Sequence, residues 1–450
     1  MEGRTVSAAV IGGGVGGIEA ARKLGELKVS PLLVVLSEER LGGRSLFEEL
    51  ALRFLLQEVR ERLRFCQGEN PREYQVLYKE LIRSRDVFCK EWQSYWKSQL
   101  ALHGVEVVYG EAFFESFYTF SVGGVHYTAE KLILATGTKE VKPAFLEGDA
   151  DRWWEWEDLP KSVAIVGSLP QAYEVAYFFA VLGVKVFLVE EGGYIFPSED
   201  SFVREIGERI LTHAGVVILK GRNVKRALKG VSGWSIVTVD NWGKEETLEL
   251  ERFVVYGERE PHSPIELRKG ENRWVAVDSS YQTSVAGVFA IGGMKGQRSA
   301  SAAKREGILA AENLFLQMMP PLVSSIHLHK DTIDYTLIPE MFFFDYPLVR
   351  IGITVDEARV RFKPYEFQVV RRKFASGLLG SAQGEVEVVL IIHKVSQTIL
   401  GMVAYGRGVE FLVSVVAVAM SLRVGLHRLG EVVYTLGTLE DFLGYIALEI

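Results

Sequence analysis

Residues Gly12 to Gly17 read GGGVGG and come directly after an apolar run, Ala8 to Ile11. Beyond them, apolar residues recur at helical spacing at Ile18, Ala21 and Leu24. An apolar strand, a glycine-rich turn and a helix in this order are typical of a dinucleotide-binding unit. The sequence therefore predicts an α/β fold that begins with such a unit.

Three glycines of this loop have separate geometric roles. Gly12 makes the tight turn, Gly14 lets backbone amides approach a pyrophosphate, and Gly17 lets the helix and the strand pack closely. The free amides at the start of the helix, together with the helix dipole, attract the phosphates. All three glycines are therefore predicted cofactor-binding residues.

A second apolar run, PLLVVL from Pro31 to Leu36, predicts the next strand. It is continuously apolar, as expected for a parallel strand that is buried on both faces. An acid at the end of this strand would accept hydrogen bonds from the adenosine ribose. Ser37 comes first after the run, and Glu38 is the predicted ribose ligand if the strand ends one residue later.

Further motifs follow in order along the chain. They are ERLGG ending at Gly43, ATG at Ala135 to Gly137, a second nucleotide-binding unit from Ser162 to Glu190, AIGG at Ala290 to Gly293 and AAENL at Ala310 to Leu314. Together with GGGVGG, this series resembles the pyridine nucleotide-disulfide oxidoreductases, the family of dihydrolipoamide dehydrogenase, glutathione reductase and mercuric reductase. The resemblance extends over nearly the whole chain.

The resemblance implies two Rossmann-like nucleotide-binding domains and a C-terminal α+β dimerisation domain. The FAD-binding domain would comprise residues 1–150 and 261–322, the NAD(P)-binding-like domain residues 151–260, and the dimerisation domain residues 323–450. A chain of 450 residues is also too long for one hydrophobic core, so about three domains are expected. The resemblance further implies a homodimer that is held together by the last domain.

Composition and charge exclude several kinds of partner. The net charge of −7 and the lack of a long Lys/Arg block argue against nucleic acid. The apolar run from Phe411 to Leu422 is shorter than the roughly 20 residues that a membrane-spanning helix needs, so we expect an interface helix and no membrane. The first strand begins within about six residues of Met1, which leaves no room for an export signal and favours a cytoplasmic location.

The sequence contains two cysteines, Cys66 and Cys89. Their spacing matches neither a Cys-x-x-Cys redox pair nor a zinc ligand set, so no metal site is predicted. Each lies in a helical stretch, and we expect two inert, half-buried thiols because free cysteine behaves as a small hydrophobic residue. A disulfide between them is an alternative that no feature of the sequence supports.

Other residues occupy the positions at which the family carries its redox-active cysteine pair. Alignment through Gly42 and Gly43 places Ser45 and Leu50 there. A serine hydroxyl cannot form the thiolate that disulfide exchange requires, and leucine has no redox chemistry. The chain is therefore not predicted to be a functional disulfide reductase.

Two further parts of the family's catalytic cycle are missing. The lysine that the family places near the flavin aligns with Phe54, whereas its partner glutamate aligns with Glu174. Near an apolar ring the pKa of Glu174 would rise; solvent exposure of Glu174 is the alternative. The histidine and the acid of the family's C-terminal dyad align with Leu436 and Asp441, so this position lacks an imidazole that could act as a base.

The second nucleotide loop, GSLPQA from Gly167 to Ala172, has lost two glycines. Leu169 places a branched side chain where a pyrophosphate should contact the backbone, and Pro170 replaces the aromatic residue that usually covers the flavin. Glu190, at the end of the next strand, still suits a ribose. The sequence therefore disfavours NAD(P) without removing every group that binds it.

FAD is the predicted cofactor, because most contacts to its pyrophosphate and adenine come from the backbone. Two changes oppose it. Ser37 stands at the position of the ribose acid, although Glu38 could take over, and Gly293 replaces the aspartate of the family's GD motif, which would bind the ribityl chain. The predicted cofactor-binding residues are Gly12, Gly14, Gly17, Glu38, Gly42, Gly43, Ala112, Thr136, Gly137, Gly167, Glu174, Glu190, Gly292, Gly293 and Ala300.

Two functions are compatible with these features. The first is an FAD-binding flavoprotein that acts as a disulfide-independent oxidoreductase or electron-transfer protein, with a protein redox partner, a small molecule or NADH as the electron donor. The second is a catalytically inactive paralogue that serves as a binding or regulatory subunit, and the fold alone does not separate the two. A membrane quinone reductase fits less well, because the end of the chain, FLGYIALEI, is short for an amphipathic anchor.

Overall fold

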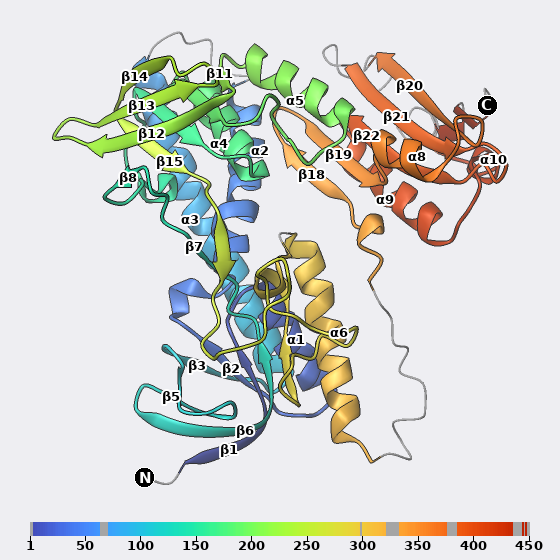
Figure 1. The fold of residues 1–450 in the computed structure, drawn as a ribbon. Helices are drawn as coiled ribbons and strands as arrows, with labels where there is room; N and C mark the ends of the chain where they lie inside the picture. The colour runs from blue at the N-terminus through green and yellow to red at the C-terminus, as the bar shows by residue number, and fades with distance from the viewer. Residues whose placement is uncertain are drawn as a thin grey trace. The chain divides into compact units, whose positions relative to one another are not determined.

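The computed structural model of this protein describes residues 3–63, 71–297, 299–320, 333–375, 385–434, 443, 444, 446 and 447. The chain forms two compact units (Figure 1). The first comprises Met1–Phe54, Ile82–Pro143 and Glu258–Ile333, and the second Leu55–Leu81, Ala144–Gly257 and Asp334–Ile450. The finer division into an FAD-binding, an NAD(P)-binding-like and a dimerisation domain stays a prediction.

The first unit is built on a seven-stranded sheet in the order β3-β2-β1-β6-β5-β4, with β17 also paired to β6. The central strands are parallel, and β4 and β5 form an antiparallel end. The strands are β1 (Arg4–Ile11), β2 (Leu32–Val35), β3 (Glu106–Tyr109), β4 (Phe113–Phe114), β5 (Thr119–Val122), β6 (Val125–Leu134) and β17 (Val288–Ala290).

The second half of strand β1 is buried on both faces, and so is the whole of β2, for which the continuous apolar run from Pro31 to Leu36 predicted it. Ala8 and Val10 belong to one hydrophobic cluster, and Ala9 and Ile11 belong to another on the opposite face. The first cluster is formed with helices α1 (Val15–Glu26), α3 (Pro71–Leu102, with its last part in this unit) and α6 (Ala300–Met318). Shorter elements of this unit are η1 (Glu38–Arg40), the π-helix η2 (Ser45–Leu50), η4 (Gly292–Lys295), and the antiparallel pair β7 (Thr138–Glu140) and β16 (Arg259–Pro261).

Helices α1 and α6 cross at two glycines. A Cβ atom added at Gly307 would lie within 3.0 Å of the carbonyl oxygen of Gly16, and one added at Gly16 would lie 2.8 Å from the carbonyl oxygen of Ala303. Real Cβ atoms essentially never come this close to backbone. The two helix backbones therefore touch directly, and α6 is held against the start of α1.

The second unit contains a four-stranded parallel sheet in the order β11-β10-β9-β15 and a second sheet in the order β14-β13-β12-β8. The parallel strands and their helices are β9 (Ser162–Val166), α4 (Pro170–Val181), β10 (Lys185–Glu190), α5 (Ser201–His213), β11 (Val217–Lys220) and β15 (Arg252–Val255). The other strands are β8 (Leu146–Glu147), β12 (Arg222–Lys229), β13 (Trp234–Asp240) and β14 (Glu245–Leu250). The unit also contains η3 (Trp153–Glu155) and most of α2 (Ala51–Leu63).

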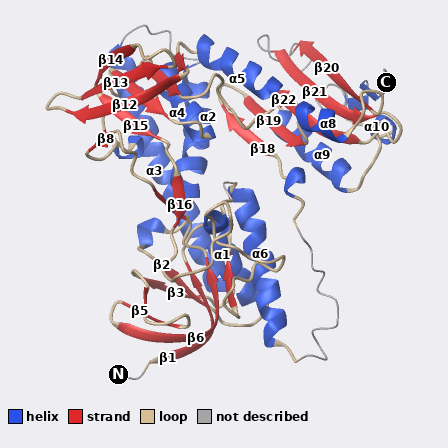
Figure 2. Ribbon diagram, in the orientation of Figure 1, coloured by secondary structure: helices blue, strands red, loops and turns tan. Residues whose placement is uncertain are grey.

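The C-terminal part of this unit has the predicted α+β character: an antiparallel sheet in the order β18-β19-β22-β21-β20 is backed by helices. Helix α9 (Val409–Ser421) packs on one face of it, against β19 and β22 (Figure 2). The elements are η5 (Tyr335–Leu337), β18 (Glu340–Phe343), β19 (Pro347–Gly352), α8 (Val355–Arg361), β20 (Phe367–Ala375), β21 (Glu385–His393), β22 (Ile399–Tyr405), α9 and α10 (Leu426–Gly430).

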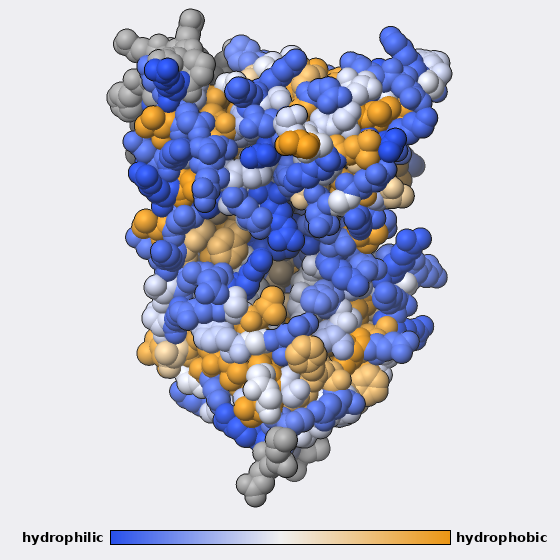
Figure 3. Space-filling view, turned by 90° about the vertical axis from the view of Figure 1, so that its left-hand side faces the viewer, coloured by the Kyte–Doolittle hydropathy of each residue, from blue (hydrophilic) through white to orange (hydrophobic). Residues whose placement is uncertain are grey.

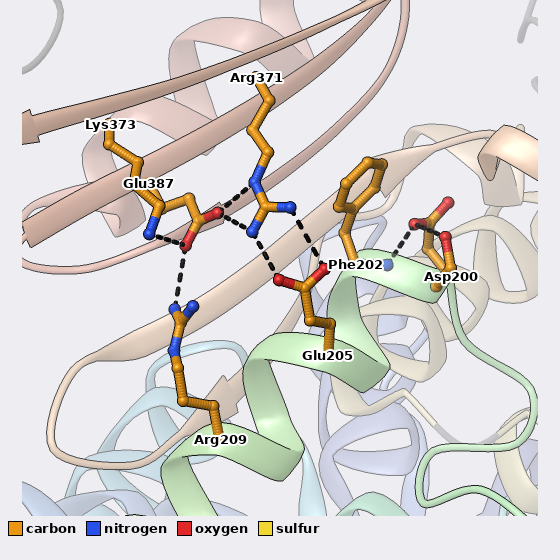
Figure 4. Close-up of polar contacts among 8 residues, drawn as sticks. Asp200, Phe202, Glu205, Arg209, Arg371, Lys373 and Glu387 are labelled. Atoms are coloured by element: carbon orange, nitrogen blue, oxygen red, sulfur yellow. Dashed lines mark hydrogen bonds and ion pairs between the residues drawn. The ribbon is translucent and has the colours of Figure 1, made fainter.

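A buried carboxylate joins this sheet to helix α5. Glu387 on β21 is 1% exposed and lies among the cationic groups of Arg371, Lys373 and Arg209 (Figure 4). Arg209 donates to Glu387 at 2.9 Å, and Arg371 also binds Glu205 of α5 at 2.7 Å. A buried carboxylate is stable only when cations and hydrogen bonds compensate it, so this cluster fixes α5 on the sheet.

The surface is mixed in character. On the face drawn in Figure 3, polar and charged side chains cover most of the area and apolar residues lie among them. No helix within the described ranges combines the length and the apolar character that crossing a bilayer demands.

Replacement of Gly307 by alanine should destabilise the first unit, because the new methyl group meets the Gly16 carbonyl. We expect a loss of about 1–3 kcal/mol in the free energy of unfolding, as for other overpacked contacts. Chemical denaturation measures it, and Ser301→Ala, at an exposed position of the same helix, is the control. A Gly307→Ala protein as stable as the control would show that the helices do not cross this closely.

Candidate functional site

The first sheet has its topological switch point at β1. The chain passes from β1 through α1 to β2 on one side of β1, whereas β6 pairs with its other side. In open α/β sheets, ligands bind outside the carboxyl ends of the strands where the order reverses. The crevice beyond Ile11 and Leu134 is therefore the candidate site.

The glycine loop after β1 has the geometry that its sequence predicts. Gly12 has a φ of +118°, and a Cβ there would lie within 3.0 Å of the carbonyl oxygen of Ala135. A Cβ at Gly17 would meet the carbonyl oxygen of Gly12 equally closely. By contrast, a Cβ at Gly14 would have nothing within 4 Å, so the backbone of Gly14 borders open space at the start of α1.

A second glycine pair faces this loop. The amide of Gly42 donates to the carbonyl oxygen of Gly13 at 2.8 Å, and a Cβ at Gly43 would lie 3.0 Å from the Cα of Gly14. Gly42 and Gly43 have φ values of +101° and +59°. The fold thus brings together the two glycine motifs that the sequence predicts to bind one cofactor.

The far side of the crevice is formed by the segment after β6 and by η4. Gly137 has a φ of +72° and borders open space, while the hydroxyl of Thr136 donates to the carbonyl oxygen of His262. A Cβ at Gly293 would lie 3.0 Å from Cγ2 of Thr138. An aspartate at position 293, which the resemblance would place there, thus needs a shift of its neighbours.

The remaining residues predicted in this unit have diverse positions. The amide of Gly292 donates at 2.7 Å to the fully buried Glu306, which also binds Lys295 at 2.9 Å. Ala300 is the first residue of α6, and Ala112, directly before β4, packs on the hydrophobic cluster that contains Ile11 and Leu134. Glu38 lies on the exposed turn η1 after β2 and forms an ion pair with Lys97 of α3.

A group of charged side chains beyond Gly137 could not be foreseen. We call it the crevice-end cluster; it consists of Arg44, Glu48, Thr138, Glu140 and Arg259. Arg44 binds Glu48 through two nitrogens, one of them at 2.6 Å, and donates to the hydroxyl of Thr138 at 3.5 Å. Arg259 donates to the same hydroxyl at 2.7 Å and to Glu140 at 2.8 Å. The only sequence signal was the i,i+4 spacing of Arg44 and Glu48.

Three residues occupy the positions at which the family carries its redox-active cysteines and its flavin lysine: Ser45, Leu50 and Phe54. Ser45 and Leu50 begin and end the π-helix, and Leu50 packs on the main core of this unit. Phe54 stacks on Phe88 of α3 with ring centroids 4.5 Å apart. Leu436 and Asp441, the predicted positions of the C-terminal dyad, lie outside the described residues.

Cys89 is a buried thiol on α3 that is 6% exposed. Burial raises its pKa to about 11, so the thiolate is scarce at neutral pH. Cys66 lies outside the described residues, and within the described ranges no cluster of His, Cys, Asp and Glu side chains has the geometry of a metal site.

In the second unit, the carboxylate predicted to bind a ribose, that of Glu190, is already hydrogen-bonded to neighbouring side chains. Glu190 is 2% exposed and accepts hydrogen bonds from Ser168 at 3.1 Å and from Tyr173 at 2.7 Å. The ring of Phe196 lies on that of Tyr173, with centroids 4.0 Å apart, and its amide donates to the Tyr173 hydroxyl. A Cβ at Gly167 would meet the carbonyl oxygen of Tyr256 within 3.0 Å, so this loop is also tightly packed.

Glu174 is buried, with 3% of its surface exposed, and its carboxylate accepts a hydrogen bond from the amide of Phe343 at 2.8 Å. The alternative of solvent exposure is therefore wrong. Within this unit Glu174 ties α4 to β18.

Comparison with known proteins identifies the family. A sequence model described as pyridine nucleotide-disulphide oxidoreductase matches residues 6–307. A dihydrolipoyl dehydrogenase of Rhizobium etli is 26% identical over 339 residues, 72% of this chain and 68% of the relative. A glutathione reductase of Yarrowia lipolytica is 24% identical over 396 residues, 82% of each chain.

Among solved structures, the HOCl-induced flavoprotein disulfide reductase RclA from Escherichia coli superimposes with a TM-score of 0.82 at 18% identity, over 99% of this chain and all of the other. The two-domain nucleotide-binding fold with a C-terminal α+β domain is thereby confirmed. The chain belongs to the pyridine nucleotide-disulfide oxidoreductases, a family of oxidoreductases whose members bind FAD and use NAD(P)H.

Proposed function

We propose that this chain is an FAD-binding flavoprotein that carries out oxidation and reduction, or electron transfer, without an active-site disulfide. The observation that carries the proposal is the arrangement of the glycine loops at the carboxyl ends of β1 and β6 in the first unit. Gly14 and Gly137 border open space in that crevice, and Gly12, Gly42 and Gly43 have the backbone geometry that a pyrophosphate requires.

The residues of the crevice fit FAD because backbone does most of the binding. The amides that follow Gly14 at the start of α1 receive the pyrophosphate, and Glu38 stands after β2 where the adenosine ribose is expected. The missing carboxylate at Gly293 removes one contact to the ribityl chain and leaves these others in place. When bound, the flavin supplies the redox chemistry, and the protein orients it and sets its potential.

Sulfur chemistry has little support in this chain. A disulfide relay needs two thiols that approach each other beside the flavin, and one of them must form a thiolate readily. Cys89 is buried in α3 and has a raised pKa. Ser45 and Leu50 stand where the relay would be, which leaves the flavin as the electron carrier.

We also propose that the second unit does not bind NAD(P)H productively at its nucleotide loop, Gly167 to Ala172, and Glu190. The carboxylate that would hold the ribose is Glu190, which is buried and already bonded to Ser168 and Tyr173. Release of Glu190 would leave the Tyr173 hydroxyl without its acceptor in the interior, which costs about 1–3 kcal/mol. The electron donor is then a protein redox partner or a small molecule.

The alternative, a catalytically inactive paralogue that serves as a binding or regulatory subunit, is favoured by one observation. Gly293 packs closely on the segment after β6, since Cγ2 of Thr138 and the Cα of Gly137 lie 3.0 and 3.2 Å from the position of a Cβ, and a glycine there supplies no carboxylate for the ribityl chain. If FAD does not bind without that carboxylate, the glycine loops no longer serve a cofactor. Flavin content separates the two functions.

The resemblance implies a homodimer, and we propose that α9 forms part of its interface. Three exposed apolar residues recur at helical spacing along α9 and at its C-cap: Phe411, Val418 and Leu422. Phe411, Val418 and Leu422 are 66%, 58% and 70% exposed, whereas the opposite side of α9 packs on the sheet. An apolar stripe of this kind is typical of a surface that a partner covers.

The purified protein should show the visible absorption bands of a flavin, and Gly14→Leu should remove them. The leucine side chain fits the open space sterically but occupies the place of the pyrophosphate, so we expect at least a tenfold loss of bound flavin, about 1.4 kcal/mol, without loss of fold. Gly193→Leu is the control, since Gly193 also borders open space.

Under anaerobic conditions, dithionite should bleach these bands, whereas NADH and NADPH should not. Rapid bleaching by either nucleotide would contradict the proposal that the second unit does not bind NAD(P)H productively. A colourless protein that FAD does not reconstitute would favour the inactive paralogue.

The thiol of Cys89 should resist modification in the folded protein. In a Cys66→Ser background at pH 8, reaction with Ellman's reagent should be at least about 100-fold slower than in denaturant, because the thiolate fraction falls with the raised pKa and burial limits access. Stopped-flow absorbance measures both rates. Equal rates would show a reactive thiol and reopen sulfur chemistry.

Val418→Glu should convert the proposed dimer into a monomer, because a carboxylate at this position cannot be buried against an apolar partner surface. Sedimentation velocity measures the change of mass. Val395→Glu is the control, since Val395 is 85% exposed in the same part of the chain but lies in the turn between β21 and β22. If both variants sediment like the wild type, α9 is not the interface.

A further inference from the structure

The loop between β10 and α5, residues 191–200, folds onto the C-terminal sheet of the same unit. Phe196 is 2% exposed, and its ring lies against those of Phe342 and Phe344, with centroids 5.0 and 6.4 Å away. A Cβ at Gly207 of α5 would lie 2.5 Å from Cε2 of Phe196, so a glycine leaves room for the ring. The φ of Phe196 is +51°, a conformation that costs free energy and persists only where the surroundings hold it.

This loop covers the acid of the second nucleotide unit. The amide of Phe196 donates to the hydroxyl of Tyr173 at 3.0 Å, and that hydroxyl donates to Glu190 at 2.7 Å. The ring of Phe196 also lies on that of Tyr173. Whatever holds the loop on the C-terminal sheet therefore also keeps Glu190 covered.

Two carboxylates at the end of this loop share one guanidinium. Glu340 on β18 and Arg350 on β19 are cross-strand partners and form an ion pair at 3.0 Å. Glu199 pairs with Nε of the same Arg350, and we call these three residues the loop clasp. The Glu199 side chain is 9% exposed, whereas that of Glu340 is 39% exposed. One cation thus compensates two carboxylates, and the buried carboxylate is the costlier one to ionise.

The charges that act on Glu199 are those of the clasp itself. Burial raises the pKa of Glu199 to about 7; Arg350 opposes this rise and Glu340 adds to it. Charged groups on the neighbouring elements have partners of their own. These partners are Tyr194 for Arg204 on α5, the amides of Phe202 and Val355 for Asp200 (Figure 4), Arg359 for Asp356 on α8, the amide of Thr354 for Glu357, and the amide of Phe343 for Glu174 on α4.

We propose that the loop clasp is a proton-controlled latch that holds residues 191–200 closed over Tyr173 and Glu190. With one proton on the two carboxylates, a single negative charge faces Arg350, and the loop is held on β18 and β19. When that proton leaves to solvent, one carboxylate is uncompensated in a buried place, and the loop opens more often. The latch needs neither FAD nor NAD(P)H, so it goes beyond the proposed function and stands or falls separately.

The direction of the pH dependence follows from the raised pKa of Glu199. In the open loop this carboxyl group is exposed to solvent, and its pKa returns to the ordinary value of a glutamate. Closure is therefore strongest below that ordinary value, weakens as the pH rises through the interval, and is weakest above about 7. Between pH 5 and pH 7 the equilibrium constant for opening should rise at least about tenfold, because opening releases up to one proton.

Hydrogen exchange followed by mass spectrometry measures this opening in the whole protein. Peptides that contain Phe196 and Glu199 report the loop, after correction for the intrinsic effect of pH on amide exchange. We expect the protection of the loop to fall at least about tenfold from pH 5 to pH 7. Peptides from β9, in the core of the same unit, should stay much better protected, which shows that the loop opens without unfolding of the unit.

Replacement of Glu199 by glutamine distinguishes a latch from an ordinary ion pair. Glutamine has the shape of the protonated side chain and does not ionise, so Glu199→Gln at pH 7 should be protected as well as the wild type at pH 5. An ordinary ion pair predicts the reverse, because loss of the carboxylate would then weaken the loop. Glu191→Gln, at an exposed position of the same loop, is the control and should behave like the wild type.

Replacement of the second carboxylate provides an independent measurement. In Glu340→Gln, Arg350 compensates Glu199 alone, so most of the pH dependence of loop protection should disappear. The latch is overturned if Glu199→Gln is less protected than the wild type at pH 7. It is equally overturned if the protection of the wild-type loop is the same at pH 5 and pH 7.

Discussion

The whole candidate site depends on how closely backbone can approach backbone at the carboxyl end of β1. Gly12 touches the segment after β6, Gly17 touches Gly12, and Gly16 touches α6. Each contact is closer than any side chain would permit, so the three chain segments meet at one point. Beside this point, a Cβ at Gly14 would have nothing within 4 Å, so the backbone there is open to a ligand.

The two nucleotide-binding units keep different parts of the pattern that the family resemblance predicts. In the first, the glycines pack closely on backbone as predicted, whereas Ser45, Leu50 and Phe54 stand at the predicted positions of the family's redox-active groups. In the second, Glu190 stands at the end of β10 as predicted, but Ser168 and Tyr173 already bind its carboxylate. A conserved-looking acid is therefore not evidence of an open site, because its partners decide whether a ligand can reach it.

This difference also explains how far the sequence could be interpreted. Glycine loops and continuous apolar strands are local signals, and the two glycine motifs predicted from them, at Gly12 to Gly17 and at Gly42 and Gly43, do lie together in the structure. The crevice-end cluster combines residues from three distant segments, since Thr138 lies 94 positions from Arg44 and 121 from Arg259. No local pattern contains such a pairing. Likewise, periodicity places Tyr173 on a helix but does not reveal that its hydroxyl faces Glu190.

The contact between Gly16 and Gly307 has a consequence for biosynthesis. Helix α1 is among the first elements to emerge from the ribosome, yet its partner α6 is made only after the entire parallel sheet of the second unit. Until then, the apolar side of α1 that α6 will cover is exposed, and closing so long a loop is slow. Nascent chains of this protein therefore keep an uncovered apolar surface near the N-terminus for much of translation, and that surface favours aggregation until α6 has been made.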